Sequence, residues 1–221
     1  MSMRGAHKVA LAVLWVLLSA YSQRANAGPI FSTFGPGDSY WPGGTVIGQA
    51  GSEQEKGYQF MFADTYSYYL DMIELPVSLY RGTNELNVWL MTDDGDVPGT
   101  IIESFSFIDA MGPYEWGRIN PLLIGNSMLH PILAQDTKYW LVASGPAADT
   151  EAIWHMSYPQ VIGLEAMRMR AGPWAGEPWE VRTNVMSAFR ISGTVIPAPG
   201  AFVLGVIGAS LVGYLLRSKT L

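Results

Sequence analysis

The stretch LNVWLMT at residues 86–92 decides the fold class, because its apolar side chains recur at every second position. This period is that of a β-strand with one face buried and the other open to water. The stretch IIESFSF at residues 101–107 shows the same alternation. Shorter runs rich in β-branched and aromatic residues follow at residues 139–143, 153–157 and 188–192. We therefore predict a chain that is mainly β.

Turn signals separate these runs. Gly, Pro, Asn and Asp gather at residues 81–84, 93–99, 112–113, 145–146 and 172–173. Many short strands joined by such turns are typical of an antiparallel β-sandwich or jelly roll. Pro76 interrupts the strand-like run 68–80, which predicts an edge position or a bulge there.

The N-terminal 27 residues have the pattern of a cleavable signal peptide. Basic residues precede an apolar run at residues 9–20, and Ala25-Asn26-Ala27 forms a small-x-small cleavage site ending at Ala27. A buried helix is the alternative, but the positive charge in front of the run favours a signal helix. We expect residues 1–27 to be removed on export.

The C-terminal segment 196–221 has the pattern of a membrane helix. Residues 201–216 are free of charge, and they are followed by Arg217 and Lys219. Such a run can span a thin bilayer with its basic end in the cytoplasm. A core helix of the domain is the alternative. We expect a transmembrane helix at 201–216, with the β-domain at 28–195 outside the cell and anchored to the membrane.

Composition excludes several function classes for this domain. Residues 28–195 hold eight basic and 19 acidic residues, which gives a formal charge of −11. A field of this sign repels nucleic acid phosphates, so no nucleic acid partner is expected. The chain has no Cys, which excludes disulfides, thiolate metal sites and cysteine nucleophiles.

The tail resembles the PEP-CTERM sorting signal of bacteria that make extracellular polysaccharide. The resemblance lies in Pro197-Ala198-Pro199, the short apolar helix and the basic end, with Ala198 where the family has Glu. It implies that an exosortase-type enzyme reads the tail and processes it near Pro197 and Pro199. It also implies a destination at the cell surface or in the extracellular matrix.

Residues 69–143 resemble the choice-of-anchor R type domain. The shared features are a strand at residues 86–92, the acidic loop with Pro98-Gly99, and a later strand that contains Thr137 and Tyr139-Trp140. The resemblance implies a β-sandwich displayed at a surface. It implies no known activity.

Two groups of residues are candidate binding sites. Asp93, Asp94 and Asp96 crowd one loop and could offer oxygen ligands to Ca²⁺, or they could bond the backbone of an ordinary turn. No other cofactor is expected. Trp174 and Trp179 could stack on sugar rings, or they could cover the core; the same two alternatives apply to Trp41 and Trp116.

Catalytic patterns are weak. His130 and His155 show no zinc-ligand spacing, and no Gly-x-Ser-x-Gly elbow accompanies them, although a Ser-His-Asp triad is left open. We therefore expect a non-catalytic structural or adhesive surface protein. A module that binds extracellular polysaccharide is the alternative, and a surface hydrolase comes third.

Overall fold

The computed structural model describes residues 28–48, 53–173 and 175–196. Strands make up 61% of these residues and helix 2%, so the prediction of a mainly β chain is confirmed. The predicted signal helix, the transmembrane helix 201–216, the processing residues Ala27, Pro197 and Pro199, and Trp174 lie outside the described residues. Within the part that is described, no helix is long and apolar enough to cross a membrane.

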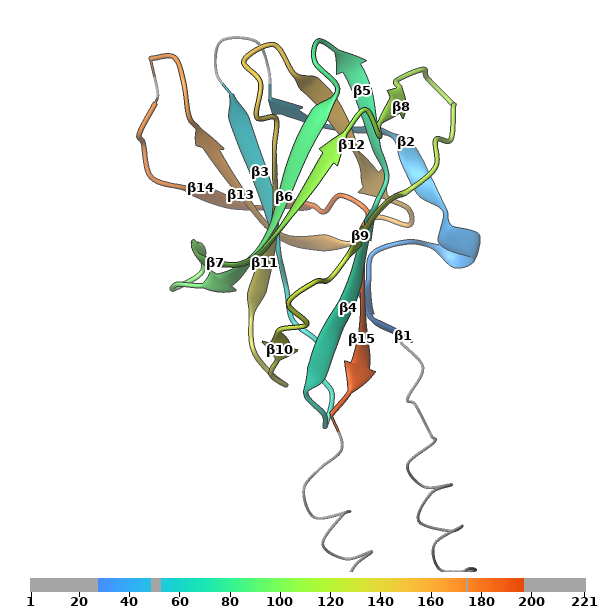
Figure 1. Cartoon of the computed structure of the whole chain (residues 1–221), viewed down its shortest axis with the longest axis vertical. Coiled ribbons are helices and arrows are strands. Elements are labelled where there is room, and N and C mark those ends of the chain that lie inside the picture. The colour runs from blue at the N-terminus through green and yellow to red at the C-terminus, as the bar shows by residue number, and fades with distance from the viewer. Residues whose placement is uncertain (1–27, 49–52, 174, 197–221) are drawn as a thin grey trace, which may run out of the picture. The chain divides into compact units, whose positions relative to one another are not determined.

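The strands form two sheets (Figure 1). The smaller sheet has the order β1-β15-β4-β10, and β9 also pairs with β4. Its members are β1 (Gly28–Ser32), β15 (Arg190–Val195), β4 (Tyr68–Leu75), β10 (Ile132–Leu133) and β9 (Leu123–Asn126). The first and last described strands are therefore neighbours, with Gly28 opposite Gly193.

The larger sheet has the order β7-β6-β11-β3-β2-β12-β5-β8, and β13 with β14 joins it at β3. Its members are β7 (Pro98–Ile108), β6 (Glu85–Asp93), β11 (Tyr139–Ser144), β3 (Gln54–Phe60), β2 (Tyr40–Gly48), β12 (Glu151–Ser157), β5 (Val77–Arg81), β8 (Gly112–Pro113), β13 (Ile162–Met169) and β14 (Glu180–Val185). The described pairings of this sheet are antiparallel except for that of β5 with β8. A short 3₁₀ turn, η1 (Pro36–Asp38), precedes β2.

The larger sheet divides at β3. On one side β3 pairs with β11, and on the other it pairs with β13 through the register Glu165–Tyr58 to Met169–Gln54. β2 meets β3 at the pair Gly48–Gln54. The ladder β2-β12-β5 therefore diverges from the ladder β3-β13-β14, and a cleft opens between them.

The alternation predicted for residues 86–92 is confirmed, and that predicted for residues 101–107 holds from Glu103 to Phe107 but not at Ile101, which is 47% exposed. Leu86, Val88 and Leu90 in β6 are fully buried, and the residues between them lie on the other face, which is only partly buried. Phe105 and Phe107 in β7 point inward in the same way. Burial of such a row is the main favourable contribution to folding.

Aromatic rings join the two sheets. The Phe60 ring of β3 lies 5.3 Å from the ring of Phe31 in β1 and 5.9 Å from that of Phe189, which directly precedes β15. Trp154 of β12 extends this cluster, with ring centres 5.1 Å from Tyr58 and 6.1 Å from Phe189. These offset and edge-to-face contacts are the preferred packing of aromatic side chains.

Pro76 lies neither at a sheet edge nor in a bulge, contrary to the prediction. β4 ends at Leu75 in the smaller sheet, and β5 begins at Val77 in the larger sheet. Pro76 thus marks the point where the chain passes between sheets. Proline has no backbone N–H, and neither ladder needs a donor at this position. The Pro76 carbonyl accepts a hydrogen bond from His155 N at 3.0 Å.

Candidate functional site

The acidic loop begins at Asp93, the last residue of β6. Its Oδ1 atom accepts hydrogen bonds from Trp140 Nε1 and Gln59 Nε2, both at 2.7 Å. Its Oδ2 atom accepts one from the backbone N–H of Asp96 at 3.2 Å. Asp93 therefore closes the turn and ties it to β3 and β11, as in the turn alternative.

Asp96 is also engaged by neighbouring side chains. Its Oδ1 atom lies 2.5 Å from Lys138 Nζ and 3.0 Å from Gln59 Nε2. The hydrogen bond from Gln59 and the charge of Lys138 lower the pKa of this carboxyl. No group of three or more His, Cys, Asp or Glu side chains among the described residues could hold a metal ion. Calcium binding by Asp93, Asp94 and Asp96 stays a prediction without geometric support.

Trp179 packs against the outer face of the larger sheet. It is partly buried and contacts a cluster of Met91, Trp140, Val142 and Ala166. The guanidinium carbon of Arg168 lies 4.3 Å from the ring centre, which is a cation–π contact. This arrangement matches the core-covering alternative for Trp179, so the geometry gives no support to sugar binding by this residue. Sugar binding at Trp174, which lies outside the described residues, stays a prediction.

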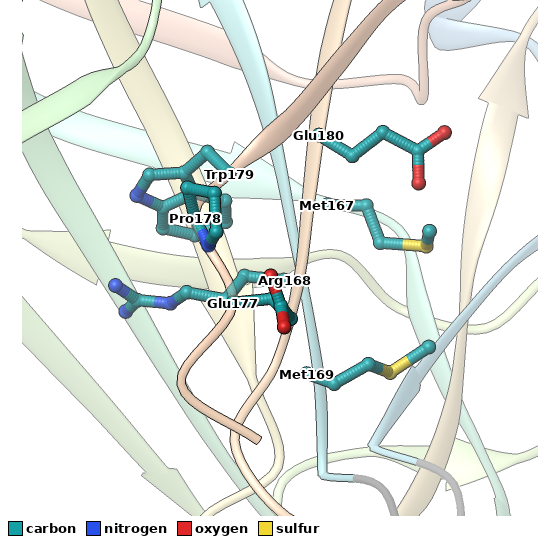
Figure 2. Close-up of a pocket in the computed structure, with 7 residues that line it drawn as sticks. All are labelled: Met167, Arg168, Met169, Glu177, Pro178, Trp179 and Glu180. Atoms are coloured by element: carbon teal, nitrogen blue, oxygen red, sulfur yellow. The ribbon is translucent and has the colours of Figure 1, made fainter. Parts of the chain in front are cut away.

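A cavity of about 580 Å³ lies where the end of β13 meets the start of β14 (Figure 2). Its lining consists of Met167, Arg168, Met169, Glu177, Pro178, Trp179 and Glu180. Figure 2 shows Met167 and Met169 pointing to one side of β13, and Arg168 pointing to the other side, toward Trp179. The residues therefore do not converge on a common centre where a ligand could be held.

A serine and a histidine come together in the interior, which the sequence did not indicate. Ser78 Oγ of β5 lies 2.8 Å from His155 Nε2 of β12, and His155 Nδ1 lies 2.8 Å from the carbonyl oxygen of Pro42. Asn120 Nδ2 donates to Ser78 Oγ at 2.8 Å. The carbonyl of Pro42 stands where a catalytic triad has a carboxylate.

This pair is enclosed by the fold. Ser78 is 0% exposed and His155 is 1% exposed, so a substrate could reach Ser78 Oγ only after the sheet had opened. The side-chain bonds connect β5 and β12 with β2 and with the loop around Asn120. We interpret the pair as a satisfied buried polar network.

Mild acid is expected to destabilise the fold through His155. Burial lowers the pKa of this imidazole below its usual value of 6.5. As the pH falls, the unfolded chain gains this proton before the folded protein does. The contribution of His155 to the free energy of unfolding is therefore complete above about pH 6.5. Below this pH it decreases by up to about 1.4 kcal/mol per pH unit until the pKa of the folded state is reached.

Urea unfolding of the wild type and of His155→Gln between about pH 7.5 and 5 measures this effect. The glutamine amide can still reach Ser78 but does not titrate. We therefore expect the unfolding free energy of the variant to lack the decrease below about pH 6.5. If the unfolding free energy falls equally with pH in the two proteins, His155 is not the cause of the acid destabilisation.

A second buried polar cluster centres on Glu165 of β13. Its Oε1 atom lies 2.6 Å from Lys56 Nζ and 3.0 Å from Arg182 Nη2, and its Oε2 atom lies 2.5 Å from Asn184 Nδ2. The side chains of Glu165 and Lys56 are 1% and 5% exposed. Burial alone would raise the pKa of Glu165, but the contacts with Lys56, Asn184 and Arg182 outweigh it and lower this pKa.

Three of the exposed aromatic side chains of the domain gather at one place. Trp41 of β2, Trp116 of the loop after β8, and Tyr158 directly after β12 are 46%, 70% and 53% exposed. The Trp41 ring centre lies 6.3 Å from that of Trp116 and 6.0 Å from that of Tyr158. We call these three residues the aromatic platform. Beside it, Trp41 and Tyr158 border a shallow groove of about 340 Å³ with Met156, Ser157, Pro159 and Gln160.

Hydrogen bonds fix the segments that carry the platform. Tyr40 Oη, next to Trp41, donates to the carbonyl of Asn120 at 3.2 Å, and Asn120 Nδ2 donates to the carbonyl of Pro113 at 2.9 Å. Ser39 Oγ donates to the carbonyl of Tyr158 at 3.4 Å. The three rings are therefore presented by segments tied to the sheet, which is the preorganisation that a binding surface needs.

Gly43 lies beneath two of the rings. A Cβ atom at this position would lie 3.0 Å from Trp41 Nε1 and 3.5 Å from Trp116 Cζ3. The absence of a side chain thus gives the two indoles room to meet edge to face. The sequence singled out Trp41 and Trp116, but it gave no signal for Tyr158, which joins them through the folding of β12 against β2.

The chain was compared with protein-family models, curated proteins and solved structures. No match was found in any of the three comparisons. The resemblances to the PEP-CTERM signal and to the choice-of-anchor R domain therefore stay predictions.

Proposed function

We propose that the chain is an exported, non-catalytic adhesion protein of the cell surface or extracellular matrix. The observation that carries this proposal is the aromatic platform. Large aromatic rings are normally at least partly buried, so three neighbouring rings that stay 46% to 70% exposed on a hydrogen-bonded framework favour a contact surface. Adhesion by such a surface needs no reacting group, and the Ser78–His155 pair lies in the interior.

In this proposal the domain at 28–195 is an antiparallel β-sandwich or jelly roll between a signal helix and a membrane helix. Two sheets joined by Phe31, Phe60 and Phe189 support this architecture. Cleavage after Ala27 and processing near Pro197 and Pro199 by an exosortase-like enzyme would display the domain outside the cell.

Export is expected to give a mature chain that begins at Gly28. The full-length chain, expressed in a host that carries an exosortase, should be cleaved by protease added to intact cells. Mass spectrometry of the mature protein reads both ends. A C-terminus at Leu221 would show that the helix is kept as an anchor, and an end near Pro199 would show processing. A cytosolic protein that retains Met1 would contradict export.

Adhesion is tested with cells that display the full chain. We expect them to be retained on polysaccharide-rich matrix, and we expect Trp41→Ala to reduce this retention while surface display stays equal. Trp179→Ala is the matched control, because Trp179 packs against the sheet away from the platform. Equal retention of all three proteins would contradict adhesion at the platform.

Carbohydrate binding is the second candidate function, and the platform favours it. One face of a pyranose ring carries C–H bonds that stack on an indole or phenol ring, while its hydroxyl groups need hydrogen-bond partners nearby.

A further inference from the structure

A polar cleft of about 510 Å³ adjoins the groove beside the aromatic platform. It lies where the ladder β2-β12-β5 diverges from β3-β13-β14. Arg81 of β5, Arg182 and Asn184 of β14, Gln54 of β3 and Glu151 of β12 contribute polar side chains to its lining. These hydrogen-bond donors and acceptors therefore come from four strands of the larger sheet.

Met156 joins the cleft to the groove beside the platform. Its side chain lines both cavities, and it stands opposite Trp41 in the ladder of β12 with β2. The rings and the polar cleft are thus two parts of one extended surface. A ligand long enough to cover both would meet apolar faces first and hydrogen-bonding groups next to them.

The charges around the cleft are largely compensated. Arg81 makes two hydrogen bonds of 2.8 Å to Glu151, and Arg182 lies 3.0 Å from Glu165. A guanidinium that already engages a carboxylate retains further N–H groups but carries little net field toward a ligand. The domain as a whole is strongly acidic, so a polyanion would be repelled. The surface therefore suits an uncharged ligand with many hydroxyl groups.

We propose that the aromatic platform and the polar cleft form one extended site for a linear, uncharged polysaccharide. Sugar rings stack on Trp41, Trp116 and Tyr158, and the hydroxyl groups of the following sugars bond to Arg81, Gln54 and Asn184. This inference rests on the proposed adhesive function at the platform, and it identifies the class of ligand.

The test uses the full chain in lauryldimethylamine oxide, a detergent without a sugar headgroup. Electrophoresis through gels that contain laminarin or hydroxyethyl cellulose probes uncharged glucans, and gels with polygalacturonate probe polyuronates. We expect at least one uncharged glucan to retard the protein. Trp41→Ala and Trp116→Ala should each weaken binding about tenfold or more, since loss of one stacking side chain has effects of this order. Trp179→Ala should bind like the wild type.

Chain length separates the two parts of the site. The wild type should bind a hexasaccharide at least about tenfold more tightly than a disaccharide of the same glucan, because the longer chain reaches the cleft. Arg81→Gln should remove most of this gain and leave disaccharide binding unchanged. Arg81→Lys, which keeps a positive charge beside Glu151 but loses the forked N–H groups, should do the same and guards against a folding effect.

The outcomes distinguish this inference from the proposed function. Retardation by polyuronate alone would overturn the uncharged ligand and leave adhesion intact. No retardation by any polysaccharide, with adhesion still dependent on Trp41, would overturn carbohydrate binding in favour of a protein partner. No retardation together with adhesion that ignores Trp41→Ala would overturn both. A hexasaccharide that gains nothing over a disaccharide would remove the cleft from the site.

Discussion

Trp154→Ala is expected to lower the free energy of unfolding by about 3–5 kcal/mol, a large part of the stability of an ordinary domain. The Trp154 side chain is fully buried and packs against the rings of Tyr58 and Phe189. Its Nε1 atom donates to the carbonyl of Ala188 at 2.9 Å. The substitution leaves a large cavity and an unpaired carbonyl at the place where β12 meets the segment that leads into β15.

Trp41→Ala is the matched control for this prediction. The same atoms are removed, but the Trp41 side chain is about half exposed on the platform. We expect its unfolding free energy to stay within about 0.5 kcal/mol of the wild type. Urea unfolding followed by far-ultraviolet circular dichroism compares the two without relying on tryptophan emission. Equal losses in the two variants would contradict the buried position of Trp154.

Glu165→Gln is expected to cost a similar amount, about 3–5 kcal/mol, because it leaves the buried ammonium group of Lys56 without its carboxylate. Lys56→Met should cost less, since Arg182 and Asn184 still engage Glu165. The double variant Lys56→Met/Glu165→Gln should be more stable than the sum of the single losses predicts.

Acid should reduce the difference in unfolding free energy between the wild type and Glu165→Gln. The pKa of Glu165 is lowered in the folded protein, so its contribution is present above the usual carboxyl range and is lost as the pH falls through the folded-state pKa. Unfolding free energies of the wild type and Glu165→Gln, measured at about pH 7 and about pH 3, give the comparison. A difference that is the same at both pH values would show that the ionised carboxylate is not what stabilises Lys56.

Local patterns predicted the sheet but not its pairing. The period of two at residues 86–92 assigned Leu86, Val88 and Leu90 to the buried face, and the structure agrees. This was possible because side chains alternate between faces within any strand, whatever its partner. Pro76 is an example of what local patterns cannot predict. The sequence indicates that this residue has no N–H for a ladder, but it does not indicate that the chain passes from one sheet to the other here.

The candidate site depends on contacts between distant segments. Trp116 and Trp179 both lie in loops rich in Gly, and nothing local distinguishes an exposed ring from one that packs under Arg168. Tyr158 reaches Trp41 because β12 pairs with β2, although more than a hundred residues separate them. The cleft exists because β3 pairs with β13 as well as with β11. The composition of a single strand does not predict any of these pairings.

The position of β15 between β1 and β4 has a mechanical consequence for a tethered protein. A pull applied through Val195 acts along β15, so the hydrogen bonds to both neighbouring strands are loaded together and slide in shear. Arg190, at the other end of the strand, is clamped by Glu74 and Asp38 and resists the same movement. A protein attached through its C-terminal end would in this way resist a pulling force on its bound ligand. In force spectroscopy we expect a higher unfolding force than for a sheet whose hydrogen bonds break one at a time.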